Sequence, residues 1–305
     1  AHRIFTLSSS SEASDLYKRQ DLFPLKVENS DETKWVLIVN INPGGPAGGS
    51  EAQYFVGDFD GKTFLSAQKE TLWMDYGKDN YAGVTWSDAP DNRRILIGWM
   101  NNWQYAGKEP AGVWSGAATF PREMGLVRDQ SLYLLTSTPV KELNLLRKEK
   151  VVFEPMMVDK SFILSDLMKF DKAPVELNIK FNQSNRTQMN FASQYGIRLK
   201  NNKGEYLVIG YDNMAKAFYV DRTNATGEMF SDKFASLHGA PYIINTSEVE
   251  WQLLIDVSSV EFFAAGNRIV FTDTFYPSEP FHTIELFTQD GLIEVISASA
   301  TQLNL

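Results

Sequence analysis

The sequence predicts an all-β protein, with two regions of strands joined by a short linker. Runs rich in Val, Ile, Phe, Tyr and Trp recur along the chain, and clusters of Gly, Asn and Asp separate them. The dipeptide Asp60-Gly61 stands between "QYFVGDF" and "KTFLSA", and these two residue types accept the positive φ of a tight hairpin turn. Residues 21–138 show no sustained 3.6-residue apolar period, which argues against amphipathic helices there.

The strands of the first region are expected in order from residue 34. The run "KWVLIVNI" (34–41) ends at the glycine-rich loop "NPGGPAGGS" (42–50), and "YAGVTW" pairs with "RILIGWM" across the turn "SDAPDNR". The runs "VWSGAATF", "MGLVRD" and "SLYLLTS" complete this region to residue 138. Residues 1–20 begin with a Ser-rich stretch without periodicity, so we expect a disordered or extraneous leader there.

A short helical linker is expected at 139–150, "PVKELNLLRKEK". Val140, Leu143 and Leu146 recur at helical spacing after a proline, and the basic run 147–150 fits a solvated helix end. Beyond it, residues 151–305 return to alternating strands with turns roughly every 8–12 residues. This pattern is typical of an antiparallel β-sandwich whose sheets each have one solvated face.

Composition excludes several classes of function. The 305 residues carry a formal net charge of −9, which disfavours nucleic acid as a partner. There are no cysteines, and the three histidines lack metal-ligand spacing, so no metal site or cofactor is expected. No apolar run approaches the roughly 20 residues of a membrane helix, and the N-terminus lacks the pattern of a signal peptide.

The first candidate site lies in "LWMDYGKDNYAGVTW" (72–86). Asp75 and Asp79 are carboxylates four residues apart, and aromatic residues that include Tyr81 surround them. Carboxylates hydrogen-bond sugar hydroxyls and aromatic faces cover sugar rings, so a sugar pocket is one interpretation. The alternative is a turn in which both aspartates cap backbone groups around Gly77.

The second candidate site lies in "GWMNNWQYAGKEPAGVWSGAATFPREM" (98–124). Several indoles stand near the amides of Asn101 and Asn102 in a loop-rich stretch, so a sugar pocket is again one interpretation, and aromatic packing between neighbouring sheets is the other. Trp99 ends an apolar strand and is expected in the core, whereas Trp103 follows two amides and is expected to face a pocket. Trp114 is a further candidate.

Two other motifs have simpler interpretations. Arg122 and Glu123 in "PREMG" form either a substrate clamp or, as we favour, an ion pair at a strand end. The glycine-rich loop 42–50 lacks the spacing of a phosphate-binding loop, and no helix pattern follows it. A nucleotide site is therefore excluded.

Three motifs together resemble glycoside hydrolase family 32, which includes invertases, exo-inulinases and levanases. They are "DLFPL…KWVLIVNINPGGPAGGSEAQYFVGDFDGKTF", "DYGKDNYA" and "WMNNWQYA…VWSGAATFPREM", and "DVSSVEFFAAGNRIVFTDTFYP" resembles the end of the family's second domain. The resemblance covers residues 21–305. It implies the C-terminal part of a five-bladed β-propeller over 21–138, followed by a β-sandwich over 151–305.

The resemblance also implies retaining hydrolysis of fructosides without a cofactor, by an Asp nucleophile and a Glu acid/base. The family motifs that carry the nucleophile and a second, stabilising Asp are absent here. In "LYKRQDLF", Lys18 stands where the family has its acid/base Glu, and an ammonium group cannot replace that carboxyl. We therefore expect this chain to be an inactive fragment of a β-fructosidase, with a non-catalytic fructan-binding relative as the alternative.

Within that interpretation, the expected partner is a fructose-containing oligo- or polysaccharide, and the expected sugar contacts are Trp103, Asn102, Asp75 and Tyr81. Trp114 is assigned to a leaving-group subsite, and Asp79 is either a contact or a scaffold for the turn. The parent protein is expected to be extracellular or periplasmic. Because residues 21–138 supply about two and a half four-stranded blades, we expect this region to be marginally stable when isolated.

Overall fold

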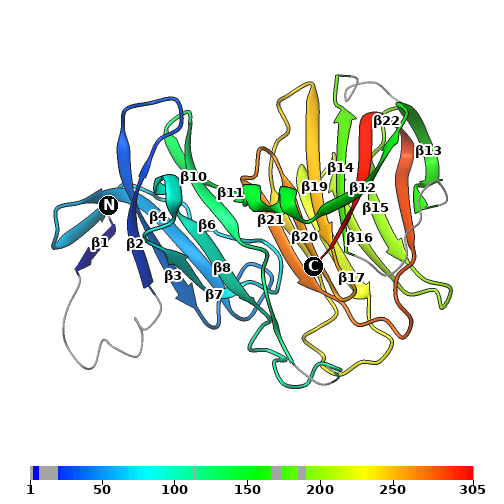
Figure 1. Cartoon of the computed structure of the whole chain (residues 1–305), viewed down its shortest axis with the longest axis horizontal. Helices are drawn as coiled ribbons and strands as arrows, with labels where there is room; N and C mark the ends of the chain where they lie inside the picture. Colours follow the sequence, from blue (N-terminus) through cyan, green and yellow to red (C-terminus); the bar gives the residue numbers. More distant parts are fainter. Residues whose placement is uncertain are drawn as a thin grey trace.

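The computed structural model describes residues 3–6, 20–110, 112, 115–165, 174–184 and 190–304. These residues form an all-β chain with two lobes, as the sequence predicts (Figure 1). The strands of the first lobe are β1 Arg3–Thr6, β2 Gln20–Lys26, β3 Thr33–Ile41, β4 Glu51–Phe59, β5 Thr63–Ser66, β6 Leu72–Trp73, β7 Tyr81–Trp86, β8 Ile95–Met100, β9 Ala117–Ala118, β10 Arg122–Asp129 and β11 Leu132–Pro139.

Two antiparallel sheets make up the first lobe. One has the order β1-β5-β4-β3-β2 with β6 on β4, and the other has the order β11-β10-β8-β7 with β9 on β8. The predicted hairpin joins β4 to β5: Gly61 has a φ of +93°, and the Asp60 carboxylate accepts hydrogen bonds from the N–H groups of Lys62 and Thr63 at 2.8 and 2.7 Å. The predicted pairing of β7 with β8 is also present.

The two sheets pack against one another through a shared core. Val36 and Ile38 of β3 join Leu96 of β8 and Leu126 of β10 in one buried apolar cluster. The other face of the first sheet is apolar as well, because Leu37 and Phe55 are buried there and further apolar residues lie half-buried around them. Alternate residues of β3 thus serve two apolar faces.

The segment 3–6 and the linker differ from expectation. Residues 3–6, within the expected disordered leader, form β1 and pair with β5. The expected helical linker is a short 3₁₀ helix, η2 (Lys141–Leu145), and Arg147–Lys150 begin β12 instead of ending a helix. Leu143 inserts into a buried cluster with Phe263 and Val270, and the backbone of β12 bonds to β22, so tertiary pairing overrides the helical spacing.

One eleven-stranded sheet makes up the second lobe. Its strands are β12 Arg147–Phe153, β13 Met156–Ile163, β14 Val175–Asn182, β15 Gln194–Lys200, β16 Tyr206–Asp212, β17 Ala217–Asn224, β18 Leu237–Pro241, β19 Glu248–Ile255, β20 Ser259–Ala264, β21 Ile269–Thr274 and β22 Thr283–Leu303. The long strand β22 pairs with β15 over its first part and with β14 over its last part.

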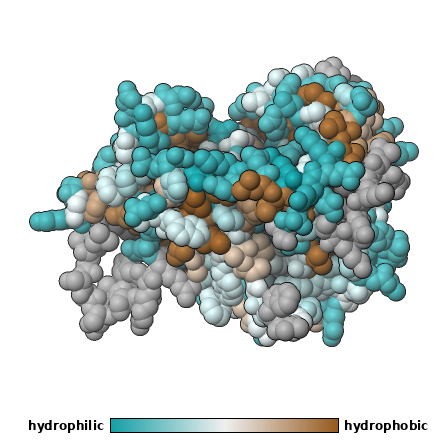
Figure 2. Space-filling model, viewed as in Figure 1, coloured by the Kyte–Doolittle hydropathy of each residue, from teal (hydrophilic) through white to brown (hydrophobic). Residues whose placement is uncertain are grey.

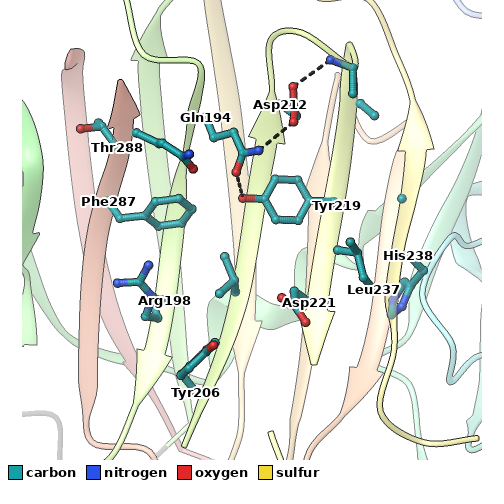
Figure 3. Close-up of a pocket in the computed structure, with 15 residues that line it drawn as sticks. Gln194, Arg198, Tyr206, Asp212, Tyr219, Asp221, Leu237, His238, Phe287 and Thr288 are labelled. Atoms are coloured by element: carbon teal, nitrogen blue, oxygen red, sulfur yellow. Dashed lines mark hydrogen bonds between the residues drawn. The ribbon is translucent and has the colours of Figure 1, made fainter. Parts of the chain in front are cut away.

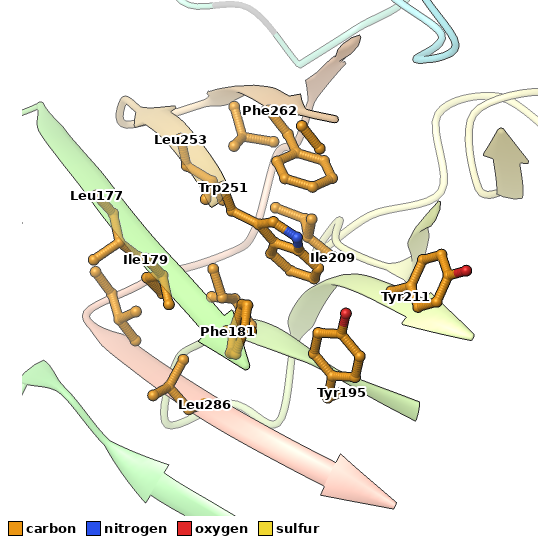
Figure 4. Close-up of a cluster of buried hydrophobic side chains, with 14 of the residues drawn as sticks. Leu177, Ile179, Phe181, Tyr195, Ile209, Tyr211, Trp251, Leu253, Phe262 and Leu286 are labelled. Carbon is orange, nitrogen blue, oxygen red and sulfur yellow. The ribbon is translucent and has the colours of Figure 1, made fainter. Parts of the chain in front are cut away.

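Around β22 the sheet folds over and encloses one core. The half β15–β18 contributes Tyr195, and the half β14, β19–β21 contributes Trp251 and Phe262 (Figure 4). Phe218 of β17 belongs to the same buried cluster. Ring centroids of Phe218 and Trp251 lie 5.9 Å apart, and those of Tyr195 and Trp251 lie 5.7 Å apart. Aromatic contacts thus cross from one half of the sheet to the other.

The outer surface is mixed in character. On the face shown in Figure 2 hydrophilic residues predominate, and apolar residues gather in patches over both lobes. Within the described part of the chain, no helix is long and apolar enough to cross a membrane.

Candidate functional site

Three aromatic side chains form a row at one end of the second sheet. Tyr81 of β7 and Trp99 of β8 are paired across the strands with ring centroids 6.5 Å apart, and Trp103 follows 4.9 Å from Trp99. Exposure increases along this aromatic row: Tyr81 is buried, Trp99 is half-buried, and Trp103 is 52% exposed. The row therefore presents indole surface to solvent on a fixed base, as a sugar platform requires.

Trp103 is held by the glycine-rich loop between β3 and β4. Its backbone N–H donates to Ser50 Oγ at 3.1 Å. Gly49 lies against Asn102, because a Cβ atom there would stand 2.1 Å from Asn102 Oδ1, and its φ is +81°. The glycine-rich loop 42–50, for which the sequence analysis rejected phosphate binding, has a structural role: it supports the turn that carries Trp103.

Asn102 is a scaffold residue and not the sugar contact that was expected. It is fully buried, and its Nδ2 donates to the carbonyl oxygens of Lys78 at 2.8 Å and Gly48 at 3.1 Å. Its Oδ1 accepts from the N–H of Gln104 at 3.0 Å. The amide thereby joins three segments, and no part of it is available to a ligand.

Glu109 is a candidate that the sequence did not reveal. It is 8% exposed, and its Oε1 accepts hydrogen bonds from Asn101 Nδ2 at 2.7 Å and from Ser115 Oγ at 2.5 Å. Its Oε2 is buried and has no hydrogen-bond partner among the described residues. Burial raises the pKa of Glu109, but the hydrogen bonds from Ser115 and its neighbours outweigh burial and hold that pKa below its usual value. An ionised oxygen without a partner is suited to accept from a ligand hydroxyl.

No sequence signal could single out Glu109, because its partners are set by how the loop 101–115 folds. Trp99 was expected in the core, and its half-buried place in the aromatic row is a correction. Trp114 and Lys18 lie outside the described residues, so the structure does not place these two.

Asp75 is buried at the contact between the lobes, which corrects its expected role as a sugar contact. Its Oδ1 accepts from the N–H of Gly77 at 2.9 Å, so the alternative of a capping turn holds. Its Oδ2 accepts from Arg122 Nη1 at 2.9 Å and from Thr272 Oγ1 at 2.6 Å. Arg122 also pairs with Glu261 at 2.5 Å and is fully buried, so it is an ion-pair residue and not a substrate clamp.

Asp79 is the scaffold residue of a second buried cluster, as one of its two expected roles allowed. Its Oδ2 accepts from Arg222 Nη1 at 2.6 Å and from the N–H and Oγ1 of Thr274 at 2.9 and 2.8 Å. Its Oδ1 accepts from the hydroxyl of Tyr105, which follows the Trp103 turn. Strands β17 and β21 thus hold both the 75–80 turn and the loop after Trp103.

Glu51 is a further buried carboxyl beside these clusters. It is 1% exposed, and its Oε1 accepts from the N–H of Ala52 at 2.9 Å. Burial, followed by the nearby charges of Asp75 and Asp79, raises the pKa of Glu51 well above its usual value. Burial at this position therefore disfavours the ionised form of the carboxyl.

No cluster of three or more His, Cys, Asp or Glu side chains capable of holding a metal ion occurs among the residues that the structure describes. The aromatic row offers indole surface, and the loop that follows Trp103 carries Glu109, whose Oε2 has no partner among the described residues. An all-β fold with such a surface defines a protein suited to a neutral polyhydroxyl ligand, because ring faces cover C–H groups and carboxylates accept from hydroxyls.

Comparison with known proteins gives the family. Residues 5–139 match the glycosyl hydrolases family 32 N-terminal domain, and residues 142–303 match the glycosyl hydrolases family 32 C-terminal domain. The first match begins ahead of Asp21, where the resemblance was expected to start. The chain belongs to glycosyl hydrolase family 32.

Individual relatives agree with this assignment. A levanase of Bacillus subtilis (strain 168) is 34% identical over 283 residues, covering 91% of this chain and 41% of the levanase. An extracellular exo-inulinase of Aspergillus awamori is 30% identical over 289 residues, covering 91% of this chain and 53% of the inulinase. The chain therefore spans about half the length, or less, of these two relatives.

Solved structures are similar over most of the chain. The crystal structure of exo-inulinase from Aspergillus awamori has a TM-score of 0.83 at 28% identity, and covers 94% of this chain and 56% of that one. A β-fructofuranosidase from Schwanniomyces occidentalis, complexed with fructosyl-erythritol, has a TM-score of 0.80 at 26% identity, and covers 94% of this chain and 60% of that one.

Proposed function

We propose that this chain is the C-terminal portion of a β-fructosidase that releases fructose from sucrose, inulin or levan by retaining hydrolysis. The aromatic row carries the proposal, because its exposed indole gives a flat surface against which a fructosyl unit can stack. Retaining hydrolysis needs two carboxyl groups about 5–5.5 Å apart, one on each side of the scissile bond. This sequence has no counterpart of either, so the chain alone is proposed to be inactive.

At the aromatic row, Trp103 is the proposed stacking surface, and Glu109 Oε2, in the loop that follows Trp103, is the proposed acceptor for a sugar hydroxyl. Trp99 packs against the exposed indole, and Tyr81 packs against Trp99. Trp114 remains the proposed leaving-group contact. Glu109 is set in place by Asn101 and Ser115 before any ligand arrives, so little ordering cost is added on binding.

The apolar second face of the first sheet supports the fragment hypothesis. Leu22, Trp35, Val39 and Phe59 lie only half-buried there around the buried Leu37 and Phe55, and Trp35 and Phe59 make an edge-to-face contact at 4.9 Å. A sheet that is apolar on both faces is typical of one covered on both sides. A neighbouring propeller blade is the proposed cover.

The proposed domains are a propeller part that ends at residue 138, a linker over 139–150 and a β-sandwich over 151–305; β1, which lies ahead of the expected start at residue 21, pairs with β5 and is counted with the propeller part. The two family matches, which meet between residues 139 and 142, support a boundary at the linker. Localisation outside the cytoplasm, extracellular or periplasmic, is proposed because the Aspergillus relative is named extracellular.

The alternative is a non-catalytic fructan-binding protein, which the missing carboxylates favour equally. Sequencing the source DNA across codons 14–21 and upstream as one molecule separates the two. A Trp-Glu-Cys-Pro-like sequence before Asp21 supports the fragment of an active enzyme. An in-frame Lys18 behind a genuine start supports the binding protein.

The binding role is tested on the chain as it exists. We expect no release of fructose from sucrose, inulin or levan, and retention on immobilised levan that weakens about tenfold in Trp103→Ala. Trp86→Ala is the matched control, since Trp86 is similarly exposed at 51% but lies outside the row. Release of fructose by the pure chain, or equal retention of the three proteins, would contradict the proposal.

A further inference from the structure

A broad trough lies on the outer face of the second lobe, over β15, β16, β17, β18 and the first part of β22 (Figure 3). Its volume is about 830 Å³. None of its lining residues belongs to the aromatic row, and all of them come from residues 194–289. It is therefore a separate surface, which the proposed catalytic function does not use.

Strand register explains why this face is hollow. One transverse row of paired residues crosses five strands, and it consists of Phe287, Gly196, Gly210, Tyr219 and Gly239. Three of the five positions are glycines without a side chain, so the rings of Phe287 and Tyr219 project from a row that is otherwise bare backbone. A Cβ atom on Gly210 would lie 2.5 Å from the Tyr219 ring, which shows that this ring lies across the glycine.

Polar side chains on one side of this row hold the Tyr219 ring in place. The Tyr219 hydroxyl donates to Gln194 Oε1 at 3.0 Å, and Gln194 Nε2 donates to Asp212 Oδ2 at 2.8 Å, as the dashed lines in Figure 3 show. Asp212 is itself fixed, because its Oδ1 accepts from the N–H groups of Met214 and Ala215 at 2.8 Å. The Tyr219 ring is therefore held in one orientation before any ligand binds.

On the other side of this transverse row, a second row of paired residues is also held by polar contacts. Arg198 Nη1 donates to Glu285 Oε2 at 2.7 Å, and its guanidinium lies 5.0 Å from the Phe287 ring centre and 5.9 Å from that of Tyr206. Asp221 lies in the same row, opposite Val208. Both flanks thus carry hydrogen-bonding groups beside aromatic surface, which is the arrangement that binds a sugar ring.

Charge decides which class of ligand fits. Arg198 is the one arginine or lysine that lines the trough among the described residues, and it is paired with Glu285, while Asp212 and Asp221 add negative charge. A polyanion such as nucleic acid finds no concentrated basic surface here. A neutral polyhydroxyl chain meets acceptors, donors and ring faces without a charge penalty.

We propose that this trough is a second sugar-binding site, which holds a stretch of neutral fructose-containing polymer away from the aromatic row. The identity of the polymer rests on the proposed function, whereas the site itself rests on the geometry of the trough. Tyr219 and Phe287 provide the stacking surfaces, and Gln194 and Arg198 provide hydrogen bonds. Such a site keeps a long polymer on the protein between separate encounters with the row, which raises its effective concentration.

The test is affinity electrophoresis of the full chain in gels that contain levan, inulin or, as a control, dextran. We expect levan or inulin to retard the protein, and Tyr219→Leu, which keeps apolar bulk without a flat ring, to weaken this retardation about tenfold. Tyr219→Phe retains the ring and is expected to lose less than threefold. Thermal melting of each variant checks that the fold is intact.

Trp103→Ala separates failure of the trough from failure of the proposed function. If both sites bind, each single variant retains part of the retardation and the double variant with Tyr219→Leu loses all of it. If Trp103→Ala alone abolishes binding and folded Tyr219→Leu has no effect, the trough proposal is overturned and the proposed function stands. If Tyr219→Leu alone abolishes binding, the trough stands and the role of the row is overturned.

A second copy of the chain is the competing occupant of this face. Light scattering after size-exclusion chromatography measures the mass of the protein with and without Tyr219→Leu. A dimer that this substitution dissociates, in a chain that no fructan retards, overturns the proposal. Retardation of a monomer by levan or inulin, but not by dextran, supports it.

Discussion

Removing the Arg122 guanidinium is expected to be the most costly single change at the contact between the lobes. Arg122 is fully buried and bonds to Asp75 at 2.9 Å, to Glu261 at 2.5 and 3.0 Å, and to Thr272 at 2.5 Å. In Arg122→Met both carboxylates lose their counter-charge while they remain out of water. Breaking a buried ion pair in this way costs about 3–5 kcal/mol.

Such a loss is a large part of the stability of an ordinary domain, about 5–15 kcal/mol. Urea unfolding of the full chain, followed by tryptophan fluorescence and far-UV circular dichroism, measures it. The loss is expected to be smaller at pH 5 than at pH 8. Burial already raises the pKa of Glu261, and without Arg122 the protonated carboxyl is favoured further, so the stability it contributes is present at low pH and decreases as pH rises.

Two further variants make the experiment decisive. Arg122→Met combined with Glu261→Gln removes one stranded charge, and it is expected to regain a substantial part of the loss. Lys141→Met breaks an ion pair with Asp91 of similar length, 2.8 Å, that is exposed to solvent, and no measurable loss is expected. A loss below about 1 kcal/mol in Arg122→Met, or a loss equal at both pH values, would refute the reasoning.

Two other predictions concern the support of the aromatic row. Glu51→Gln is expected to raise the melting temperature at pH 8 relative to the parent protein and to change it little near pH 4. The pKa of Glu51 is raised in the folded protein, so the stability that its protonated form contributes is present at low pH and is lost as pH rises. An equal change in melting temperature at both pH values would contradict this prediction. Gly49→Ala is expected to lower the stability by roughly 2 kcal/mol or more. Its new Cβ atom lies 2.1 Å from Asn102 Oδ1, and the positive φ adds a strain of about 1–2 kcal/mol. Gly61→Ala has only the backbone strain, because no heavy atom lies within 4 Å of its Cβ position. Calorimetry of both variants measures the difference, and equal losses would show that Asn102 moves aside.

Chain pattern alone was sufficient for the fold class and for many of the strands. Alternating apolar residues and turn residues act locally, so the Asp60-Gly61 hairpin and the β7–β8 pairing follow from short stretches of sequence. The linker shows where local pattern fails. Val140, Leu143 and Leu146 have helical spacing ahead of the solvated run Arg147–Lys150, yet that run forms strand because β22 offers unpaired backbone groups beside it.

The candidate site residues also divide into those that local sequence pattern could indicate and those that depend on tertiary contacts. Aromatic residues next to amides pointed to the stretch that carries Trp103, and the structure leaves that indole 52% exposed. The roles of Asp75 and Asn102 could not be predicted, because whether a polar side chain faces a ligand or a buried partner depends on segments far away in sequence. Arg122 and Thr272 reach Asp75 from 47 and 197 residues away.

The sequence by itself determined that this chain is all β and that it belongs to glycosyl hydrolase family 32. These properties are written in local patterns and in motifs. Only the tertiary structure decided that Asp75, Asp79 and Asn102 are scaffold residues, that Glu109 has an unpaired oxygen, and that glycines and aromatic rings align into a trough. The physical reason is that burial, pairing and register depend on contacts between distant strands, which no single stretch of sequence specifies.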